Sequence, residues 1–245
     1  MRLEGKKVLV TGGTLGIGRS IVDELLRRKC EVITWARQEP KDSALPSSVG
    51  FYVCDLGSAQ QREDLVRRIC EEHKNLSTVI NNAVIRHLID FPSTEYAEIV
   101  RTTRLELGLN VEAPMLLTAG LLPLLMEQPE AVIVNVTTGL ALAPKRSSPV
   151  YCATKAALRS FTRSLRYQLE KTAPHVRVQE VLPPLVDTRM TAGRGAGKIR
   201  PEDVSATLVE AIESGVEECY VGKSKLLKVM MRLAPSVAYR VLKEW

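Results

Sequence analysis

The chain has 245 residues, of which 45% are hydrophobic and 4% aromatic, and its formal net charge is +6. This length suffices for one large α/β domain or two small ones, with a core built mainly from aliphatic side chains. The Lys and Arg residues are spread over many segments and form no block interleaved with aromatic residues, which argues against nucleic-acid binding.

Short apolar runs and amphipathic segments alternate along the chain. Apolar runs that are typical of buried strands lie at 6–11, 31–36, 49–56, 77–83, 131–138, 175–183 and 218–222. Helical periodicity is found at 17–30, 58–74, 97–126, 150–172 and 201–214, with Ser58 as a cap and Pro114 as a bend. This alternation predicts an α/β fold in a single domain: a doubly wound parallel sheet of about seven strands with helices on both faces.

The spacing of the cysteines and histidines and the composition of the N-terminus further limit the class of protein that we expect. The five cysteines are odd in number and have no C-x-x-C spacing, which indicates reduced core residues of a cytoplasmic protein. His73, His87 and His175 lie far apart, so we expect no metal site. The N-terminus has no apolar signal core, and the stretch 115–126 is too short and interrupted to span a membrane.

A glycine cluster, TGGTLGIG, separates the first strand from the first helix. Gly12, Gly16 and Gly18 follow a G-x-x-x-G-x-G spacing. Glycines at such a turn let a pyrophosphate approach the N-terminus of the helix, where free N–H groups favour anions. The alternative is a glycine-rich turn without a ligand.

The end of the second strand bears on the choice of cofactor. An acid at this position would bind a ribose 2′-hydroxyl and favour NAD, but the strand is followed directly by Arg37. A guanidinium pairs well with a 2′-phosphate, so we expect NADP(H). Glu39 keeps NAD(H) as an alternative, and Arg37 as a solvated loop residue is another.

Tyr151 and Lys155 stand four residues apart on a predicted helix and therefore point the same way. An ammonium nearby lowers the pKa of a phenol and lets it exchange a proton while a carbonyl and an alcohol interconvert. The alternative is a tyrosine that packs on a lysine stem. Thr138 ends a strand thirteen residues before Tyr151, whereas Thr137 is interpreted as an ordinary strand residue.

Taken together, TGGTLGIG, NNA at 81–83, Asn110, the strand-end hydroxyl and YCATK resemble the short-chain dehydrogenase/reductase family over nearly the whole chain. The resemblance implies a Rossmann-type fold and an NADP(H)-dependent oxidoreductase that interconverts a carbonyl and an alcohol. It implies that Tyr151 exchanges the proton, that Lys155 lowers its pKa and holds the nicotinamide ribose, and that Thr138, where the family usually has serine, binds the substrate oxygen. Asn110 matches the asparagine that ties a water into a proton relay.

The same resemblance implies the cofactor contacts. Asp55 matches the acid that contacts the adenine, 81–83 line the adenosine side, and 183–188 lie near the nicotinamide amide. The implied cofactor-binding residues are Gly12, Thr14, Leu15, Gly16, Ile17, Gly18, Arg37, Asp55, Leu56, Asn82, Ala83, Tyr151, Lys155, Pro183, Val186 and Thr188. Val84 and Pro184 replace family glycines, which leaves a dinucleotide-binding regulator or scaffold without turnover as the alternative function.

The segments at 149–170, 80–83 and 183–188 look most like the DltE-type oxidoreductases of this family. Residues 1–222 are expected to hold the cofactor and substrate sites, and 223–245 a basic amphipathic tail of the same domain. The family forms its substrate lid at 189–200, which here is short and glycine-rich and suits a bulky or carrier-linked substrate. The expected partner is thus a small-molecule or carrier-linked carbonyl or alcohol. The tail packs on the domain or a partner, or touches a membrane surface. The family also implies a homodimer or homotetramer through the helices at 97–126 and 150–172.

Overall fold

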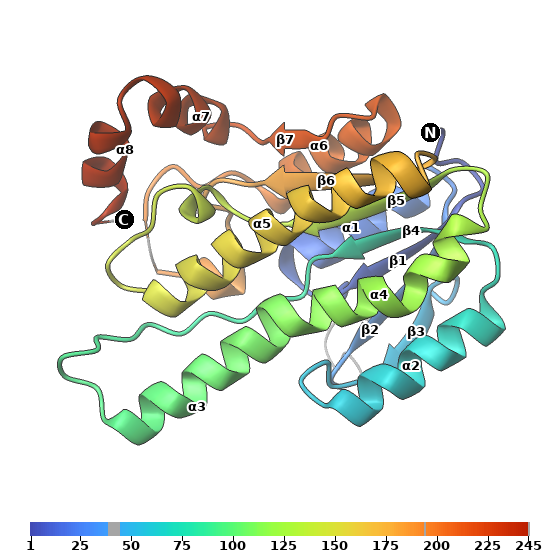
Figure 1. Ribbon diagram of the computed structural model, residues 1–245, viewed down its shortest axis with the longest axis horizontal. Coiled ribbons are helices and arrows are strands. Elements are labelled where there is room, and N and C mark those ends of the chain that lie inside the picture. The colour runs from blue at the N-terminus through green and yellow to red at the C-terminus, as the bar shows by residue number, and fades with distance from the viewer. Residues whose placement is uncertain (39–44, 194, 245) are drawn as a thin grey trace.

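The computed structural model describes residues 1–38, 45–193 and 195–244, and a parallel sheet of seven strands forms the centre of this part (Figure 1). The strands are, in spatial order, β3 (Gly50–Val53), β2 (Glu31–Ala36), β1 (Lys7–Thr11), β4 (Leu76–Asn81), β5 (Ala131–Val136), β6 (Val176–Leu182) and β7 (Glu218–Tyr220). The order reverses between β1 and β4, so the prediction of a doubly wound parallel sheet is confirmed.

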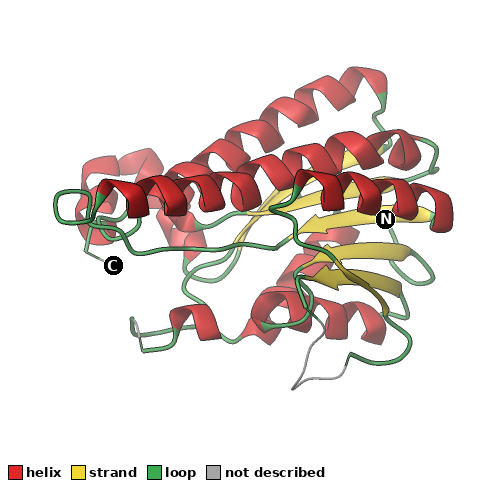
Figure 2. Ribbon diagram, turned by 90° about the horizontal axis from the view of Figure 1, so that it is seen from below, coloured by secondary structure: helices red, strands yellow, loops and turns green. Residues whose placement is uncertain are grey.

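Helices cover both faces of the sheet (Figure 2). One layer contains α1 (Gly16–Arg27) and α6 (Pro201–Ser214), and the other contains α2 (Ala59–Glu72), α4 (Ala113–Met126) and α5 (Pro149–Thr172). Because successive strand residues point to opposite faces, Val8 and Val10 pack with α1 and α6, whereas Leu9 packs with α2 and α4. Ser58 caps α2 as predicted, its side chain accepting from the Gln61 N–H.

Two strands end earlier than the sequence indicated. The predicted strand at 77–83 stops at Asn81 because the N–H groups of Asn82 and Ala83 donate to the Thr11 hydroxyl instead of to a neighbouring strand. The predicted strand at 49–56 stops at 53, and the N–H of Asp55 donates to the side chain of Gln61. In both places the strand end becomes part of the edge where the candidate site lies.

A long helical segment runs from 96 to 126, and its irregularity lies earlier than the predicted bend at Pro114. It consists of α3 (Tyr96–Leu107), a π-helical turn (Gly108–Glu112) and α4, and Pro114 stands in the first turn of α4. A proline has no N–H for the carbonyl four residues before it, here that of Asn110, so the irregularity falls on the preceding turn.

The prediction that the apolar stretch at 115–126 is too short and interrupted to span a membrane does not hold for the longer helical segment that contains it. Its 31 residues are long and apolar enough by length and composition, and 44% of its most apolar part is buried within the protein. Leu117 and Leu121 are fully buried against the sheet, as in a core helix.

The five cysteines are unpaired, and Cys30, Cys54, Cys152 and Cys219 are buried, as predicted.

The C-terminal segment forms two helices, α7 (Ser224–Leu233) and α8 (Pro235–Leu242), which follow β7 at the end of the sheet (Figure 1). Two short 3-10 turns, 139–141 and 189–191, follow β5 and β6 respectively. Both turns lie at the carboxyl ends of their strands, on the same side as the glycine cluster.

Candidate active site

The turn between β1 and α1 is built so tightly that only glycine fits at two of its positions. Gly12 has φ +67°, and a Cβ on it would lie 3.2 Å from the Cα of Ala83. A Cβ on Gly18 would lie 2.1 Å from the carbonyl oxygen of Gly12. The helix cap, Leu15, makes no side-chain capping bond and is 59% exposed. The first N–H groups of α1 are therefore not used by a cap, which is the arrangement that suits an anion.

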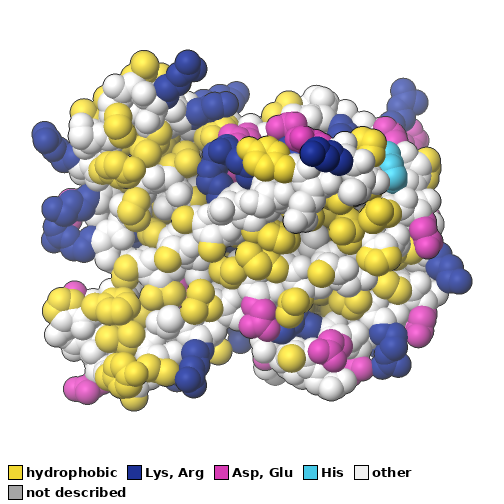
Figure 3. Space-filling view, viewed as in Figure 1, with side chains coloured by type: hydrophobic (Ala, Val, Ile, Leu, Met, Phe, Trp, Pro, Cys, Tyr) yellow, Lys and Arg dark blue, Asp and Glu magenta, His cyan; other side chains and the backbone are white. Residues whose placement is uncertain are grey.

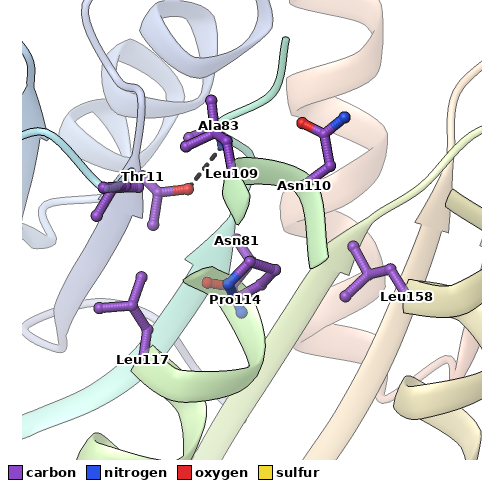
Figure 4. Close-up of a pocket in the computed structure, with 9 residues that line it drawn as sticks. Thr11, Asn81, Ala83, Leu109, Asn110, Pro114, Leu117 and Leu158 are labelled. Carbon is purple, nitrogen blue, oxygen red and sulfur yellow. Dashed lines mark hydrogen bonds between the residues drawn. The ribbon is translucent and has the colours of Figure 1, made fainter. Parts of the chain in front are cut away.

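Residues 82 and 83 are held against this turn. The Thr11 hydroxyl accepts from the N–H of Asn82 at 2.8 Å and of Ala83 at 2.7 Å, and the Asn82 amide donates to the Thr11 carbonyl at 3.0 Å. Figure 4 shows the Thr11–Ala83 bond beside a small internal pocket that Leu109 and Asn110 also line. The strand order reverses here, the place where open α/β sheets bind their ligands.

The segment after β6 reaches the same place. A Cβ on Gly16, which has φ +55°, would lie 3.3 Å from Cγ2 of Thr188, so Thr188 borders the N-terminus of α1. Pro183 and Val186, which belong to this segment, are buried, whereas Thr14 in the turn and Ile17 at the start of α1 are half-buried. The structure thus brings the first and last parts of the predicted cofactor site together.

The residues expected at the adenosine end differ in exposure. Asp55 is exposed and accepts from the Gly57 N–H at 2.9 Å, whereas Leu56 is buried. Arg37 is exposed directly after β2. Glu39, on which the NAD(H) alternative rests, lies outside the described residues.

Tyr151 and Lys155 lie one turn apart near the start of α5, and both are buried, with 8% and 2% of their surface exposed. The Lys155 ammonium donates to the carbonyl of Val136, the last residue of β5, at 2.9 Å. Thr138 follows two residues later, half-buried, and its hydroxyl accepts weakly from the Leu140 N–H at 3.4 Å. Since α5 packs against the turn at 139–141, the three side chains predicted to share a site lie at one strand end.

Burial dominates the protonation of this pair. It raises the pKa of Tyr151 to about 12 and lowers the pKa of Lys155 to about 8. Lys155, which the resemblance implies lowers the pKa of this tyrosine, is not among the groups that act on it here; the cation that opposes the effect of burial is Arg86. The Lys155 ammonium itself donates to the Val136 carbonyl.

Thr137 is more than an ordinary strand residue. It is buried, and its hydroxyl donates to a carboxylate oxygen of Glu180 on β6 at 2.5 Å. Glu180 also pairs with Arg159 and raises the pKa of Lys155, while burial raises the pKa of Glu180 itself. This buried carboxyl therefore partly compensates the charge of the lysine.

Asn110 is buried in the π-helical turn and fixes a neighbouring loop. Its amide donates to the Ile85 carbonyl at 2.8 Å and to the Thr154 hydroxyl at 3.2 Å, and its carbonyl oxygen accepts from the Ile85 N–H at 3.0 Å. All these bonds come from the side chain, which thus ties the loop after β4 to α5.

Arg86 and Glu106 were missed by the sequence analysis. Glu106, 1% exposed on α3, accepts from the backbone N–H of His87 and from its ring at 3.1 Å. Arg86 stands between two fixed neighbours, Ile85 and His87, and its guanidinium carbon lies 5.8 Å from the centre of the Tyr151 ring. It also donates to the Met190 carbonyl at 3.1 Å. The signal available in the sequence was an arginine close behind the asparagines that end β4.

Comparisons with known proteins agree with this arrangement. Residues 6–198 match the model of the short chain dehydrogenase family. The chain is 43% identical over 192 residues to the uncharacterized oxidoreductase DltE of Bacillus subtilis (strain 168), which covers 77% of this chain and 74% of that protein.

Solved structures show the same fold. A short chain dehydrogenase from Burkholderia cenocepacia J2315 in complex with NADP has a TM-score of 0.87 and 25% identity over 99% of both chains. A short chain dehydrogenase/reductase from Burkholderia phymatum in complex with NAD has a TM-score of 0.83 and 18% identity over 100% of this chain and 97% of its own. The protein described here thus belongs to the short-chain dehydrogenase/reductase family of oxidoreductases and resembles its DltE-like members.

Proposed function

We propose that the protein is an NADP(H)-dependent oxidoreductase that interconverts a carbonyl and an alcohol. The observation that carries the proposal is the bond from Lys155 to the Val136 carbonyl, because it holds the Tyr151–Lys155 turn of α5 at the strand end from which Thr138 follows. A proton donor, a cation and a second hydroxyl then border one place, as transfer of a proton to a substrate oxygen requires.

The residues present fit a nicotinamide dinucleotide. The pyrophosphate would lie at the N-terminus of α1, where a Cβ on Gly12 or Gly18 would occupy the space that the turn needs. Thr188, beside Gly16, and Lys155 would border the nicotinamide half. When bound, the cofactor supplies or accepts the hydride.

NADP(H) is preferred over NAD(H) on the strength of Arg37, which is exposed at the end of β2 where no acid stands. The 25% identical relative solved with NADP supports this choice. Arg37→Ser is expected to raise the KM for NADPH at least about tenfold with little change for NADH, since a bidentate charged contact is lost. Equal effects on both cofactors would contradict the assignment.

Two residues of the chain, Thr138 and Tyr151, act on the substrate oxygen. Thr138 donates a hydrogen bond to it, and the Tyr151 hydroxyl gives it a proton in reduction and takes the proton back in oxidation. A pKa of about 12 keeps this phenol protonated at neutral pH, so the site as it stands is prepared to donate. The glycine-rich segment 189–200 borders the site through Met190 and Arg86, and its Gly193, Gly195 and Gly197 all have positive φ. Such a segment suits a bulky or carrier-linked carbonyl compound.

Turnover of NADPH with a panel of ketones and aldehydes tests the proposal. Tyr151→Phe is expected to lower kcat by about 10²- to 10⁴-fold, the range of general acid catalysis, and to leave NADPH binding unchanged. Tyr167→Phe is the matched control, since Tyr167 lies on the same helix and is 58% exposed. NADPH binding without Tyr151-dependent turnover on any substrate would instead favour a regulator or scaffold.

We also propose a homodimer or homotetramer that uses the faces of α3–α4 and α5. Leu105 and Leu116 are 44% and 50% exposed there, although the opposite side of α4 is buried. Leu116→Glu is expected to shift the protein to monomers in light scattering after gel filtration, because it sets charges against charges across a twofold interface. A wild-type protein that is monomeric would contradict the proposed oligomer and would leave the proposed activity unaffected.

A further inference from the structure

The last two helices hold most of the net charge of the protein. Residues 223–244 contain six Lys and Arg residues and one acid, Glu244. This leaves 28 of the 34 basic residues and 27 of the 28 acidic ones for the rest of the chain, which is therefore nearly neutral. Of the net charge of +6, a share of +5 thus lies in this one segment.

The same helices leave most of their apolar side chains uncovered. On α7, Leu226, Val229 and Leu233 are 63%, 51% and 76% exposed, and Ser224 is the only buried residue. On α8, the exposed side chains include Val237 and Val241. Packing on its own domain, one of the alternatives for the tail, thus covers only part of these helices.

The exposed side of α7 is divided into two parallel stripes. Leu226, Val229 and Leu233 are spaced i, i+3 and i+7, which sets them along one side of the helix. Lys225, Lys228 and Arg232 have the same spacing one residue earlier and form the adjoining stripe. In Figure 3, hydrophobic and basic side chains gather in the upper left, where α7 and α8 lie.

We propose that α7 and α8 bind the surface of an anionic lipid bilayer. An apolar stripe beside a row of Lys and Arg is the pattern of helices that lie in the interface, with the leucines among the acyl chains and the cations at the headgroups. With ten and eight residues, α7 and α8 are too short to cross a bilayer.

A second copy of the chain is a poorer partner for this surface. A twofold contact between two such patches would bring twelve basic residues together with only two acids, the Glu244 of each copy. Like charges in that number oppose association, whereas an anionic bilayer attracts all of them.

The surface also borders the candidate active site. A Cβ on Gly139, next to Thr138, would lie 2.7 Å from Cδ2 of Leu227, so α7 packs directly on the turn after β5. A molecule docked through α7 and α8 would hold its site close to the membrane surface. The binding itself does not depend on the proposed reaction.

Co-sedimentation of the full chain with vesicles tests the proposal. We expect binding to phosphatidylcholine vesicles with about 30% phosphatidylglycerol, weakening with salt, and little binding to phosphatidylcholine alone. Leu226→Ser with Leu233→Ser, and Lys225→Glu with Arg232→Glu, should each weaken binding at least about tenfold. Lys171→Glu and Val53→Ser, which change exposed residues away from α7 and α8, should leave it unchanged; Val53 lies on β3, at the opposite edge of the sheet from β7.

Two results would overturn the proposal. One is an absence of binding to anionic vesicles, or binding that the α7 variants do not alter. The other is a change of oligomeric state in these variants without any effect on vesicles, which would assign the surface to a second copy. Circular dichroism and thermal unfolding identify variants that fail to fold. Because the apolar pair and the basic pair of substitutions are independent, the test can use whichever double variant folds.

Discussion

Arg86 lies over the ring of Tyr151, with its guanidinium carbon 5.8 Å from the ring centre. The residues on either side of it are fixed from two helices, Ile85 by Asn110 and His87 by Glu106. The position of Arg86 is therefore built into the fold, and its charge opposes the rise in the pKa of Tyr151 that burial causes.

Arg86→Gln is expected to raise the pKa of Tyr151 further, because the phenolate loses the cation whose charge lowers its pKa. Alcohol oxidation needs the deprotonated phenol, so its rise with pH should move to higher pH. At a fixed pH below the pKa the rate should fall about fivefold to tenfold, as a loss of roughly 1 kcal/mol of stabilisation implies. The pH profile of kcat for oxidation measures this.

Arg86→Lys is the control for charge. It should keep the wild-type pH profile more closely than Arg86→Gln, even where it loses the contact with the Met190 carbonyl. Identical profiles for wild type and Arg86→Gln would show that the cation does not act on the tyrosine.

The buried Lys155 should make stability depend on pH. Below pH 8 the ammonium is charged in both states and its burial penalty is fully present. Between pH 8 and the unfolded value of 10.5 the folded protein loses this proton first, so the free energy of unfolding rises with pH. Relative to Lys155→Met, wild type should gain up to about 3 kcal/mol across that range.

Urea unfolding of both proteins at pH 7 and pH 10 measures this difference. The comparison removes the contributions of Cys30 and Cys54, whose raised pKa values of about 11 are common to both proteins and act in the opposite direction. A difference that does not change with pH would mean that the lysine is not desolvated as described.

Thr138→Ser is expected to retain activity, with a wider range of substrates, because it keeps the hydroxyl and removes a methyl group. Thr138→Ala should lose about 10²- to 10³-fold in kcat, as when one hydrogen bond to a developing charge is removed. The hydroxyl also accepts from the Leu140 N–H, so thermal unfolding should accompany the kinetics. An alanine variant as active as wild type would exclude Thr138 from the site.

Gly18→Ala should destabilise the protein by about 1–3 kcal/mol or prevent folding, since its Cβ would lie 2.1 Å from the Gly12 carbonyl oxygen. Gly108→Ala is the matched control, because no atom lies within 4 Å of a Cβ built there. Differential scanning calorimetry measures both. Equal melting temperatures for the two variants would contradict the close approach of α1 to the turn.

Much of the fold could be predicted from local patterns. The alternation of apolar runs and amphipathic segments determined the parallel sheet with helices on both faces, because each pattern depends on neighbouring residues alone. The glycine turn was visible for the same reason. The strand ends at 54–56 and 82–83 could not be predicted, since they depend on whether a distant side chain such as Thr11 takes the backbone N–H groups.

For the candidate site, the sequence by itself determined which chemical groups are available: Thr138, Tyr151 and Lys155 could be identified from residue type and spacing. Only the tertiary structure decided their surroundings. It buried Tyr151 and Lys155, turned the ammonium to the Val136 carbonyl and set Arg86 over the tyrosine ring. Burial and charge act through space, and the residues that supply them here come from helices and loops far apart in the chain.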